Sequence, residues 1–596
     1  MSAIRLSVLF VMILALHVKV LAQTDSTKKR ILDNRLSKEV MKTISRKPSS
    51  DSSINVKSEA PFLPYEGKII RHIVINHIGF ERTMYDSSHR FKSEVTRIAN
   101  TLHSTTRESV IRDNLFVREN RPLNPYRVAD NERYLRDLDF ILDSKIIVHR
   151  IKGSPDSVDL EIVTRDVFSL GARVSSGGIS DYRIGLYDAN LFGMGQRVQA
   201  GVGFETGRSP VVGLDLFYRK TSIGGTLINV SGGYTQLDNA RSLGEENEYA
   251  YFIRLERPLV SPYSRLAGGL EVSRNWSRNV FQYPDSTFRK YRYNIEDVWG
   301  GYNFSIGNMA KNRDRHFAAI RYYRQHYSQQ PSQPGEEFNP IYNDQKFVLG
   351  EMTFYNRNFY KTRYIYGFGR TEDVPYGKTI TLTTGWSKEL GAKRMYAGTS
   401  FTRGFVNKNG AFTTIEGGFG TFFTSKKTSD TFYYIGGTHY SKLYESGRVK
   451  IRHLVQGGYA QAYNTITREL LTLNDELTGF SPDSLYGKQR ISLRVETTVF
   501  TKWKLAGFRF APFLSLENAF LKDIISSKSL GEFYWGTTSG VRIRNENLIF
   551  GTIELRAFYF PTAVDGVSHL SFKITTNVRL KYSGRFVNPP SFVRYN

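Results

Sequence analysis

The chain has 596 residues, of which 14% are aromatic and 50 are glycine, and its formal net charge is +26. This composition is too aromatic for a disordered chain. The sequence contains no cysteine, which excludes disulfides, zinc–thiolate sites and lipidation of an N-terminal cysteine.

Residues 1–22 have the pattern of a secretory signal peptide. Arg5 gives a positive start, eleven apolar positions follow over residues 6–16, and small residues precede Gln23. The alternative is a buried N-terminal helix. The run is too short to cross a bilayer, and no other stretch approaches the roughly 18 apolar residues of a membrane helix. For an exported chain, anionic lipid phosphates suit the positive charge better than nucleic acid, so we expect no nucleic-acid partner.

Residues 23–66 are expected to form a polar leader. Leu32, Leu36, Val40 and Ile44 recur every four residues, which predicts one short amphipathic helix. That helix either lies on a partner or membrane surface or packs loosely. Residues 48–64 are rich in serine and proline, which is typical of a linker.

Residues 67–166 are expected to form one compact α+β unit in the order β-α-α-β-β. The stretch GKIIRHIVINHIGF has strand composition. Asn124 can cap a helix that begins at Pro125. The expected helices and the two later strands cover residues 107–116, 124–138, 140–151 and 157–167.

From residue 167 to residue 596 the dominant pattern is alternation of apolar and polar residues. The stretch HLSFKITTNVRL, for example, places Phe572 and Ile574 on one face and Lys573 on the other. Long segments, charges on the polar face and aromatic residues at strand ends favour a transmembrane antiparallel β-barrel over a soluble sandwich. We count sixteen to twenty candidate strands and expect sixteen, with residues 346–463 ambiguous.

The stretch YDANLFGMGQ resembles a motif of the POTRA-plus-barrel superfamily of outer-membrane assembly and translocation proteins, which includes BamA-like and surface antigen D15-type proteins. In that family a D-x-N-L-F-G-x-G run separates the second and third barrel strands. The α+β unit resembles a single POTRA domain, so the chain resembles a short branch of the family. The resemblance implies a tight turn with an apolar pair at the lipid interface. The turn residues are Asp188, Asn190, Leu191, Phe192, Gly193 and Gly195.

The same family threads a loop into the barrel, and the loop tip carries a Val-Arg-Gly-Phe-type sequence. The counterpart here is Leu477, Thr478, Gly479 and Phe480, so that threonine replaces the arginine. The resemblance implies that the family's arginine contacts acidic groups of the lumen. By alternation Glu496 and Glu517 point inward, and we expect Lys488 or Arg494 to bind them instead.

The resemblance implies a non-enzymatic protein of the bacterial outer membrane, with a periplasmic N-terminal domain, that assists insertion, assembly or translocation of other outer-membrane proteins. An edge strand of the POTRA-like unit would capture clients by strand addition. Its residues are Lys145, Ile146, Ile147 and Val148. A weak seam between residues 168–178 and 569–580 would admit a client hairpin, because Gly171, Gly177 and Gly178 weaken the first strand. The implied partners are outer-membrane lipid and lipopolysaccharide, unfolded clients, and periplasmic chaperones or accessory lipoproteins.

The sequence contains no enzyme motif, and we expect no cofactor and no metal site. Eleven histidines lack ligand spacing, and neither a G-x-S-x-G elbow nor a P-loop occurs. The run TEDVPYG at 371–377 suits a loop entering a strand better than a calcium site. Two other functions stay open: a transport channel with the POTRA-like unit as docking module, and a structural surface antigen. The residues after Leu580 either fill the lumen or hang free.

Overall fold

The computed structural model describes residues 54–593 with several gaps. The gaps are residues 79–103, 177–180, 238–245, 306–312, 332–339, 425–426, 448, 467–469, 475, 481, 483–484, 506–507, 523–529, 546–551, 563, 565 and 579–583. The predicted signal peptide, the predicted amphipathic helix, and Gly177 and Gly178 lie outside the described residues. Within the described ranges, no helix combines the length and apolar character that crossing a membrane requires.

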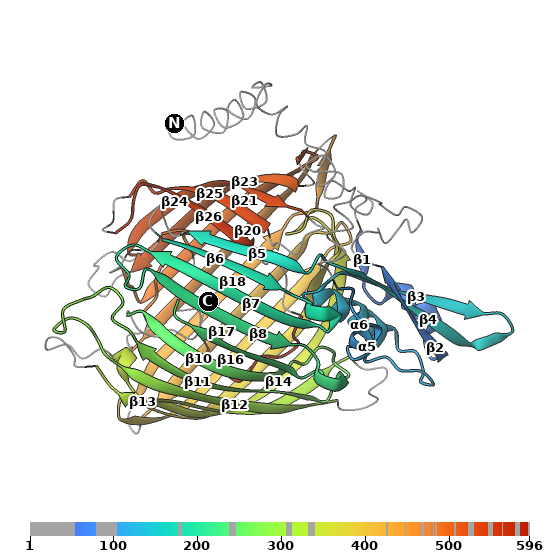
Figure 1. The fold of residues 1–596 in the computed structure, drawn as a ribbon, viewed down its shortest axis with the longest axis horizontal. Helices are drawn as coiled ribbons and strands as arrows, with labels where there is room; N and C mark the ends of the chain where they lie inside the picture. The colour runs from blue at the N-terminus through green and yellow to red at the C-terminus, as the bar shows by residue number, and fades with distance from the viewer. Residues whose placement is uncertain are drawn as a thin grey trace.

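A small α/β unit precedes a large β-barrel (Figure 1). The unit contains β2 (Ile69–Ile78), α5 (Glu108–Arg112), α6 (Pro125–Asp137), β3 (Ile141–Ile151) and β4 (Ser154–Asp166). The barrel contains β5 (Leu170–Ser176), β6 (Asp181–Asp188), β7 (Gln196–Glu205), β8 (Val212–Lys220), β9 (Asn229–Thr235), β10 (Glu248–Arg257), β11 (Leu266–Ser277), β12 (Arg292–Phe304), β13 (Arg315–Gln329), β14 (Gln345–Thr362), β15 (Glu372–Glu389), β16 (Ala392–Val406), β17 (Phe412–Phe423), β18 (Thr428–Tyr440), β20 (Val449–Tyr463), β21 (Gln489–Thr501), β23 (Phe508–Lys522), β24 (Glu532–Arg544), β25 (Thr552–Tyr559) and β26 (Leu570–Val578).

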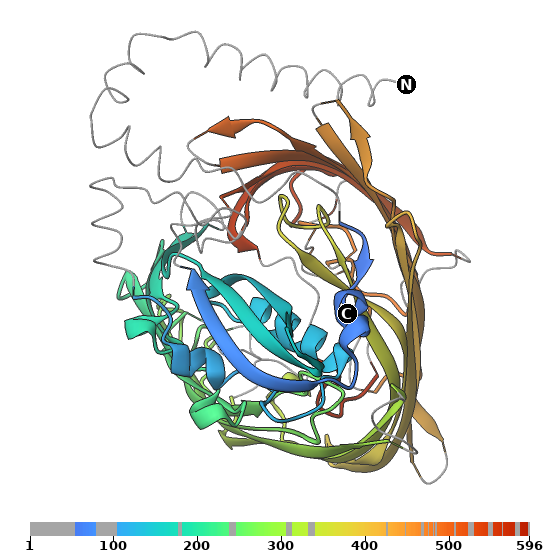
Figure 2. The same ribbon diagram turned by 90° about the vertical axis from the view of Figure 1, so that its right-hand side faces the viewer.

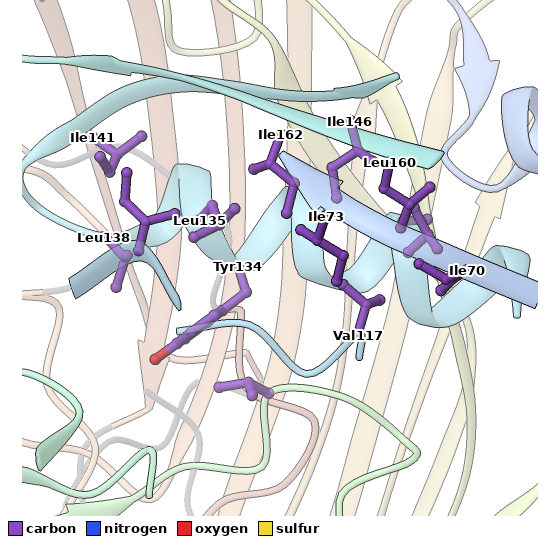
Figure 3. Packing of buried hydrophobic residues seen from close by; sticks show 14 of the residues in the cluster. Ile70, Ile73, Val117, Tyr134, Leu135, Leu138, Ile141, Ile146, Leu160 and Ile162 are labelled. Carbon is purple, nitrogen blue, oxygen red and sulfur yellow. The ribbon is translucent and has the colours of Figure 1, made fainter. Parts of the chain in front are cut away.

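The three strands of the α/β unit form one sheet in the order β2-β4-β3. Strand β2 is parallel to β4, whereas β3 is antiparallel to it. The sequence order β-α-α-β-β is present in the described residues, and the Asn124 side chain accepts a hydrogen bond from the Arg127 amide at the start of α6. Leu135 of α6 belongs to the same buried cluster as Ile146 and Ile162 of the sheet (Figure 3).

In the described part of the chain, twenty long strands form the barrel, once the short strands β1 (Val56–Lys57), β19 (Tyr444–Ser446) and β22 (Lys504–Leu505) are set aside. The prediction of sixteen strands is therefore wrong, and the number lies at the upper end of the counted range. The difference arises in the ambiguous region, where β14 to β18 and β20 are six separate strands. The turn between β15 and β16 contains only two residues, Leu390 and Gly391, so no loop composition marks it in the sequence.

The outer face of the barrel is apolar, and its inner face is polar. On β26, Phe572 and Ile574 are 67% and 51% exposed, whereas Glu496 of β21 and Glu554 of β25 are 4% and 0% exposed. Neighbouring strands repeat the pattern with further exposed apolar side chains: Leu493, Val495, Leu514, Leu516 and Leu555. A soluble protein has the reverse arrangement, whereas a barrel in lipid has this one.

The α/β unit lies across one mouth of the barrel (Figure 2). Helix α6 contacts the barrel wall, because Arg136 binds Asp373 of β15 and Lys361 of β14 binds Glu132. Ion pairs between α6 and the barrel wall therefore join the unit to the barrel at the mouth.

Candidate functional site

A buried network of four charges joins α6 to the barrel wall. The Arg136 guanidinium donates to Glu132 Oε1 at 2.6 Å and to Asp373 Oδ1 at 2.8 Å. Lys361 of β14 also binds Glu132. Burial alone would raise the pKa of Glu132, but the charges of Lys361 and Arg136 outweigh it and lower the pKa to about 2. Glu132 therefore stays ionised at neutral pH. The sequence did not predict this network, because its barrel partners are more than 200 residues away along the chain.

The same network occupies half of the predicted client-capture edge. Strand β3 lies at one edge of the three-stranded sheet. Glu132 Oε2 accepts a hydrogen bond from the Ile146 amide at 3.0 Å, and Arg136 Nη1 donates to the Ser144 carbonyl at 2.9 Å. Along an edge strand, the backbone N–H and C=O groups of every second residue point away from the neighbouring strand. After Ser144 and Ile146, Val148 is therefore the next residue of β3 whose N–H and C=O point outward, and no described contact occupies them. All four predicted edge residues lie in register with β4, and Ile146 is the one among them that Glu132 binds.

The motif between β6 and β7 forms a tight turn at the same mouth. Gly193 and Gly195 have φ angles of +69° and +64°, values that favour glycine. The Asn190 side chain is fully buried, and its Oδ1 accepts a hydrogen bond from the Gly195 amide at 2.7 Å. The backbone N–H of Asn190 donates to Asp188 Oδ1 at 2.9 Å. These contacts fix the shape of the turn.

The turn also binds the α/β unit, which the resemblance did not imply. Asn190 Nδ2 donates to Thr106 Oγ1 at 2.8 Å, and Thr106 in turn donates to Asp166 at the end of β4. The Arg107 amide donates to the Gly193 carbonyl at 2.9 Å. A Cβ atom at Gly193 would lie 2.1 Å from the Thr105 carbonyl oxygen. Glycine is therefore required for close approach of the two parts as well as for the turn.

The two apolar residues of the motif, Leu191 and Phe192, differ in how far they are exposed. Phe192 is 63% exposed, while Leu191 is half-buried. Arg107 Nε donates to the Phe192 carbonyl at 3.2 Å. An exposed phenylalanine at the barrel rim is compatible with the expected place at a lipid interface.

The barrel ring closes through a sparse seam between β5 and β26. The two strands form a single residue pair, Thr575 with Ser175, among the described residues. By contrast, β25 and β26 share seven pairs and β5 and β6 also share seven. The described ladder at the seam is therefore much shorter than the ladders on either side of it.

The described residues of the loop 470–488 lie inside the lumen, and the loop tip binds an inner-wall carboxylate. The Thr478 amide and hydroxyl donate to Glu517 at 2.6 and 3.0 Å. Leu477 and Phe480 are buried, and Phe480 packs against Phe560 with ring centroids 5.2 Å apart. Gly479 has a φ of +82° and lies against Phe558.

Two arginines of the inner wall, Arg494 and Arg542, form ion pairs with the acidic side chains of the lumen. Arg494 donates to Glu496 at 2.9 Å and lies 3.5 Å from Glu517. Arg542 binds Glu496 at 2.6 Å and Glu554 at 2.9 Å. Of the two predicted partners, Arg494 is in the network, whereas the described contacts of Lys488 are backbone hydrogen bonds. Sequence reasoning missed Arg542, although its alternation with Val541 and Ile543 placed it on the polar face.

The acidic pair in TEDVPYG has protein partners and begins β15 rather than lying in a loop. Glu372 accepts hydrogen bonds of 2.8 to 2.9 Å from the amides of Ile365, Tyr366 and Gly367, and Asp373 binds Arg136. Across the described ranges, no group of three His, Asp or Glu side chains is arranged to hold a metal ion.

No protein-family model matches the chain, and a comparison with curated proteins finds no significant relative. Among solved structures, it is similar to BamA from Haemophilus ducreyi lacking POTRA domains 1–3, at 10% identity and a TM-score of 0.32, covering 85% of this chain and 84% of that one. It is similar to CdiB from Acinetobacter baumannii (10%, 0.38, 86% and 74%) and to CdiB from Escherichia coli (11%, 0.30, 92% and 96%). Similarities at this sequence identity and TM-score assign neither a function nor a family to the chain.

Proposed function

We propose that the chain is a non-enzymatic barrel of the bacterial outer membrane that assists insertion, assembly or translocation of other outer-membrane proteins. The observation that carries this proposal is the seam, where the described parts of β5 and β26 share one residue pair. A fully paired barrel has no free strand edge. A barrel whose seam is held by a short ladder can open there and offer two edges to which a client strand can add.

The physical basis is the cost of unpaired backbone groups in lipid, which is several kcal/mol per group. A client hairpin that pairs with β5 or β26 satisfies groups on both sides. Such pairing uses backbone hydrogen bonds and makes few demands on client sequence. The apolar exterior of β26, with Phe572 and Ile574, places this edge in contact with lipid.

The α/β unit acts in this proposal as a periplasmic POTRA-like domain at the barrel mouth. Its β3 edge offers client capture from Val148 to Ile151, because α6 side chains occupy the edge at Ser144 and Ile146. Client strands would add there first and then reach the seam. Outer-membrane lipid and lipopolysaccharide surround the barrel in this arrangement.

The test uses a disulfide across the seam, which is possible because the natural chain has no cysteine. The variant Ser175→Cys/Thr575→Cys joins directly paired residues. The control Ala557→Cys/Phe572→Cys joins paired residues of β25 and β26 away from the seam. We expect the oxidised seam variant to lower the amounts of other outer-membrane proteins and reductant to restore them. Unchanged amounts with a fully formed seam disulfide contradict the proposal.

A transport channel is the second candidate, favoured by the polar and charged inner face. The pairs of Arg321 with Asp297 and of Arg254 with Glu271 line the lumen. If the seam disulfide leaves other outer-membrane proteins unchanged and deletion of the chain alters uptake of one solute, the channel is the better description.

A further inference from the structure

Residues 584–593, called here the lumen segment, lie along the inner wall of the barrel. At the mouth, the Gly584 carbonyl accepts a hydrogen bond of 3.1 Å from Arg133 of α6. At the other end, the Val593 amide donates to the Tyr396 hydroxyl on β16 at 2.7 Å. The residues after Leu580 that the structure describes therefore fill part of the lumen rather than hang free.

Most polar contacts of the lumen segment involve its backbone. Arg357 of β14 donates to the Arg585 carbonyl at 2.6 Å, and Arg321 of β13 donates to the Pro590 carbonyl at 2.9 Å. The Phe586 amide donates to the Leu259 carbonyl at 3.1 Å. Together with Arg133, three guanidinium groups thus bind three carbonyl groups of one extended segment. Any extended polypeptide offers the same carbonyls, so this recognition does not depend on sequence.

Two aromatic anchors supply the selective part of the binding. Phe586 is 3% exposed and packs against Tyr355 and Phe359, with ring centroids 5.8 and 5.7 Å apart. Phe592 lies in a box of three aromatic rings at 4.8 to 5.0 Å. The box consists of Phe347, Tyr396 and Phe422. Aromatic pairs at these distances contribute beyond the area that they bury.

Two features of the inner barrel wall favour binding of an extended chain beside β13 and β17: an oriented arginine and two glycines. Arg321 uses Nε and Nη2 for Asp297, both at 2.8 Å, which aims Nη1 at the Pro590 carbonyl. On β17, a Cβ atom at Gly418 would lie 2.7 Å from Val593 Cγ1, and one at Gly420 would lie 3.2 Å from Val593 Cβ. Small residues there let the segment approach the wall. We define the lumen groove by its contact residues: Leu259, Arg321, Phe347, Arg357, Tyr396 and Phe422.

The lumen segment is not part of the barrel ladder and is separable from it. Its residues belong to no strand, and Pro589 and Pro590 have no amide hydrogen to donate. A cavity of about 200 Å³, lined in part by Glu256, Glu271 and Arg585, lies beside it. The segment can therefore leave the groove without breaking a strand pair.

We infer that the lumen groove is a binding site for extended polypeptide carrying an aromatic side chain, and that the lumen segment is its resident occupant. During translocation or assembly, a passing polypeptide exchanges with the segment, binding the same guanidinium groups and the same aromatic box. This inference rests on the proposed function in polypeptide handling and adds the site and the chemical class of its ligand.

The first experiment measures binding of a fluorescein-labelled peptide, GRFVNPPSFV, to the purified full-length protein in detergent. Two variants vacate the groove: Phe592→Ala, and a chain that lacks residues 584–596. A third, Gly420→Cys/Val593→Cys, locks the segment in place when oxidised, since the Cβ separation of 3.2 Å is close to the usual range of about 3.5–4.5 Å. The new Cβ also meets the Tyr396 hydroxyl, so the reduced form of the same variant is measured as its reference. We expect the peptide to bind both vacated proteins at least about tenfold more tightly than the oxidised locked protein.

Matched controls make the result specific. A peptide with alanine at both phenylalanine positions should bind about tenfold more weakly to the vacated proteins. Phe401→Ala removes an aromatic ring from the lipid-facing side of β16, the strand that carries Tyr396, and should leave peptide binding at the parent level. The inference is overturned if neither vacated protein binds the peptide, or if the oxidised locked protein binds it equally well.

The second experiment records ion conductance in planar lipid bilayers. The locked protein should conduct least when oxidised and return to the parent level on reduction, whereas Phe592→Ala should open about tenfold more often. Equal conductance in all three proteins contradicts a removable occupant. The seam disulfide should leave peptide binding unchanged, so a failure of the proposed seam function is distinguishable from a failure of this groove.

Discussion

Arg136 of α6 forms a forked ion pair with Asp373 of β15, with hydrogen bonds of 3.0 Å from Nε and 2.8 Å from Nη2. Both side chains are nearly buried, at 7% and 12% exposure. The pair joins the α/β unit to a barrel strand across 237 positions of the chain. It therefore fixes how the unit lies across the mouth, and with it which part of the β3 edge is covered by α6.

Replacing Arg136 with alanine should release the α/β unit from the mouth. The change leaves Asp373 buried without its partner, which typically costs about 3–5 kcal/mol. Limited proteolysis of the detergent-solubilised protein would measure this as faster cleavage within residues 104–166, while heat-modifiable gel migration of the barrel stays unchanged. The control Arg112→Ala removes an exposed pair with Glu108 and should change the cleavage rate little, since such pairs contribute about 0.5 kcal/mol. Equal cleavage rates for both variants contradict the docking role.

Acid should loosen the same contact through Glu132. Its pKa in the folded protein is about 2, below the ordinary value of 4.5. A lowered carboxyl pKa stabilises the folded state above the ordinary value, and this stabilisation is lost as the pH falls from about 4.5 towards 2. The proteolysis assay with an acid-active protease should show docking that weakens over this window, with a flatter profile for Glu132→Gln.

The comparison between parent and Glu132→Gln is essential for that measurement. Burial raises the pKa of Asp130 and Asp143 in the same unit, and these groups favour the folded state as the pH falls. The raw profile contains both effects, whereas the difference between the two proteins isolates Glu132. Identical profiles would show that Glu132 does not hold the unit at the mouth.

The sequence predicted features that depend on local periodicity and failed for those that depend on distant partners. Asn124 caps α6 as expected, and the exposure of Phe572 follows from alternation alone. The twenty strands were undercounted, because two-residue turns such as Leu390–Gly391 leave no compositional mark. No local pattern connects Lys361 to Glu132, since the two meet only when the barrel wall closes around α6.

The charged side chains inside the lumen show the same limit of prediction from sequence. Alternation placed Glu496 and Glu517 on the inner face, and both are buried there. Which cation binds each one depends on strand neighbours: Arg494 pairs directly opposite Glu517 across β21 and β23. Arg542 reaches Glu496 from β24, two strands away. Choosing among inward arginines therefore requires the register of three strands.

Replacing Arg542 with alanine should destabilise the barrel wall. The change leaves Glu496 and Glu554 buried without their shared cation, a loss of about 3–5 kcal/mol for breaking a buried pair. The temperature at which the barrel loses its fast gel migration should fall clearly. Arg542→Lys keeps the charge but loses the fork that binds two carboxylates, so an intermediate temperature is expected. A lysine variant as unstable as the alanine variant would show that packing against Phe513, rather than charge, is the main contribution of Arg542.

Replacing Gly193 with alanine should separate the effects of turn strain and close approach. Alanine at a φ of +69° is strained, and its Cβ would lie 2.1 Å from the Thr105 carbonyl oxygen. The control Gly153→Ala has a φ of +82° but meets no atom within 4 Å, so it reports the backbone strain alone, about 1 kcal/mol. We expect Gly193→Ala to cost at least about 3 kcal/mol, because steric overlap adds to the strain. Faster proteolysis of the α/β unit in Gly193→Ala than in Gly153→Ala would assign the motif to docking of the unit. Equal rates would reduce the motif to an ordinary tight turn.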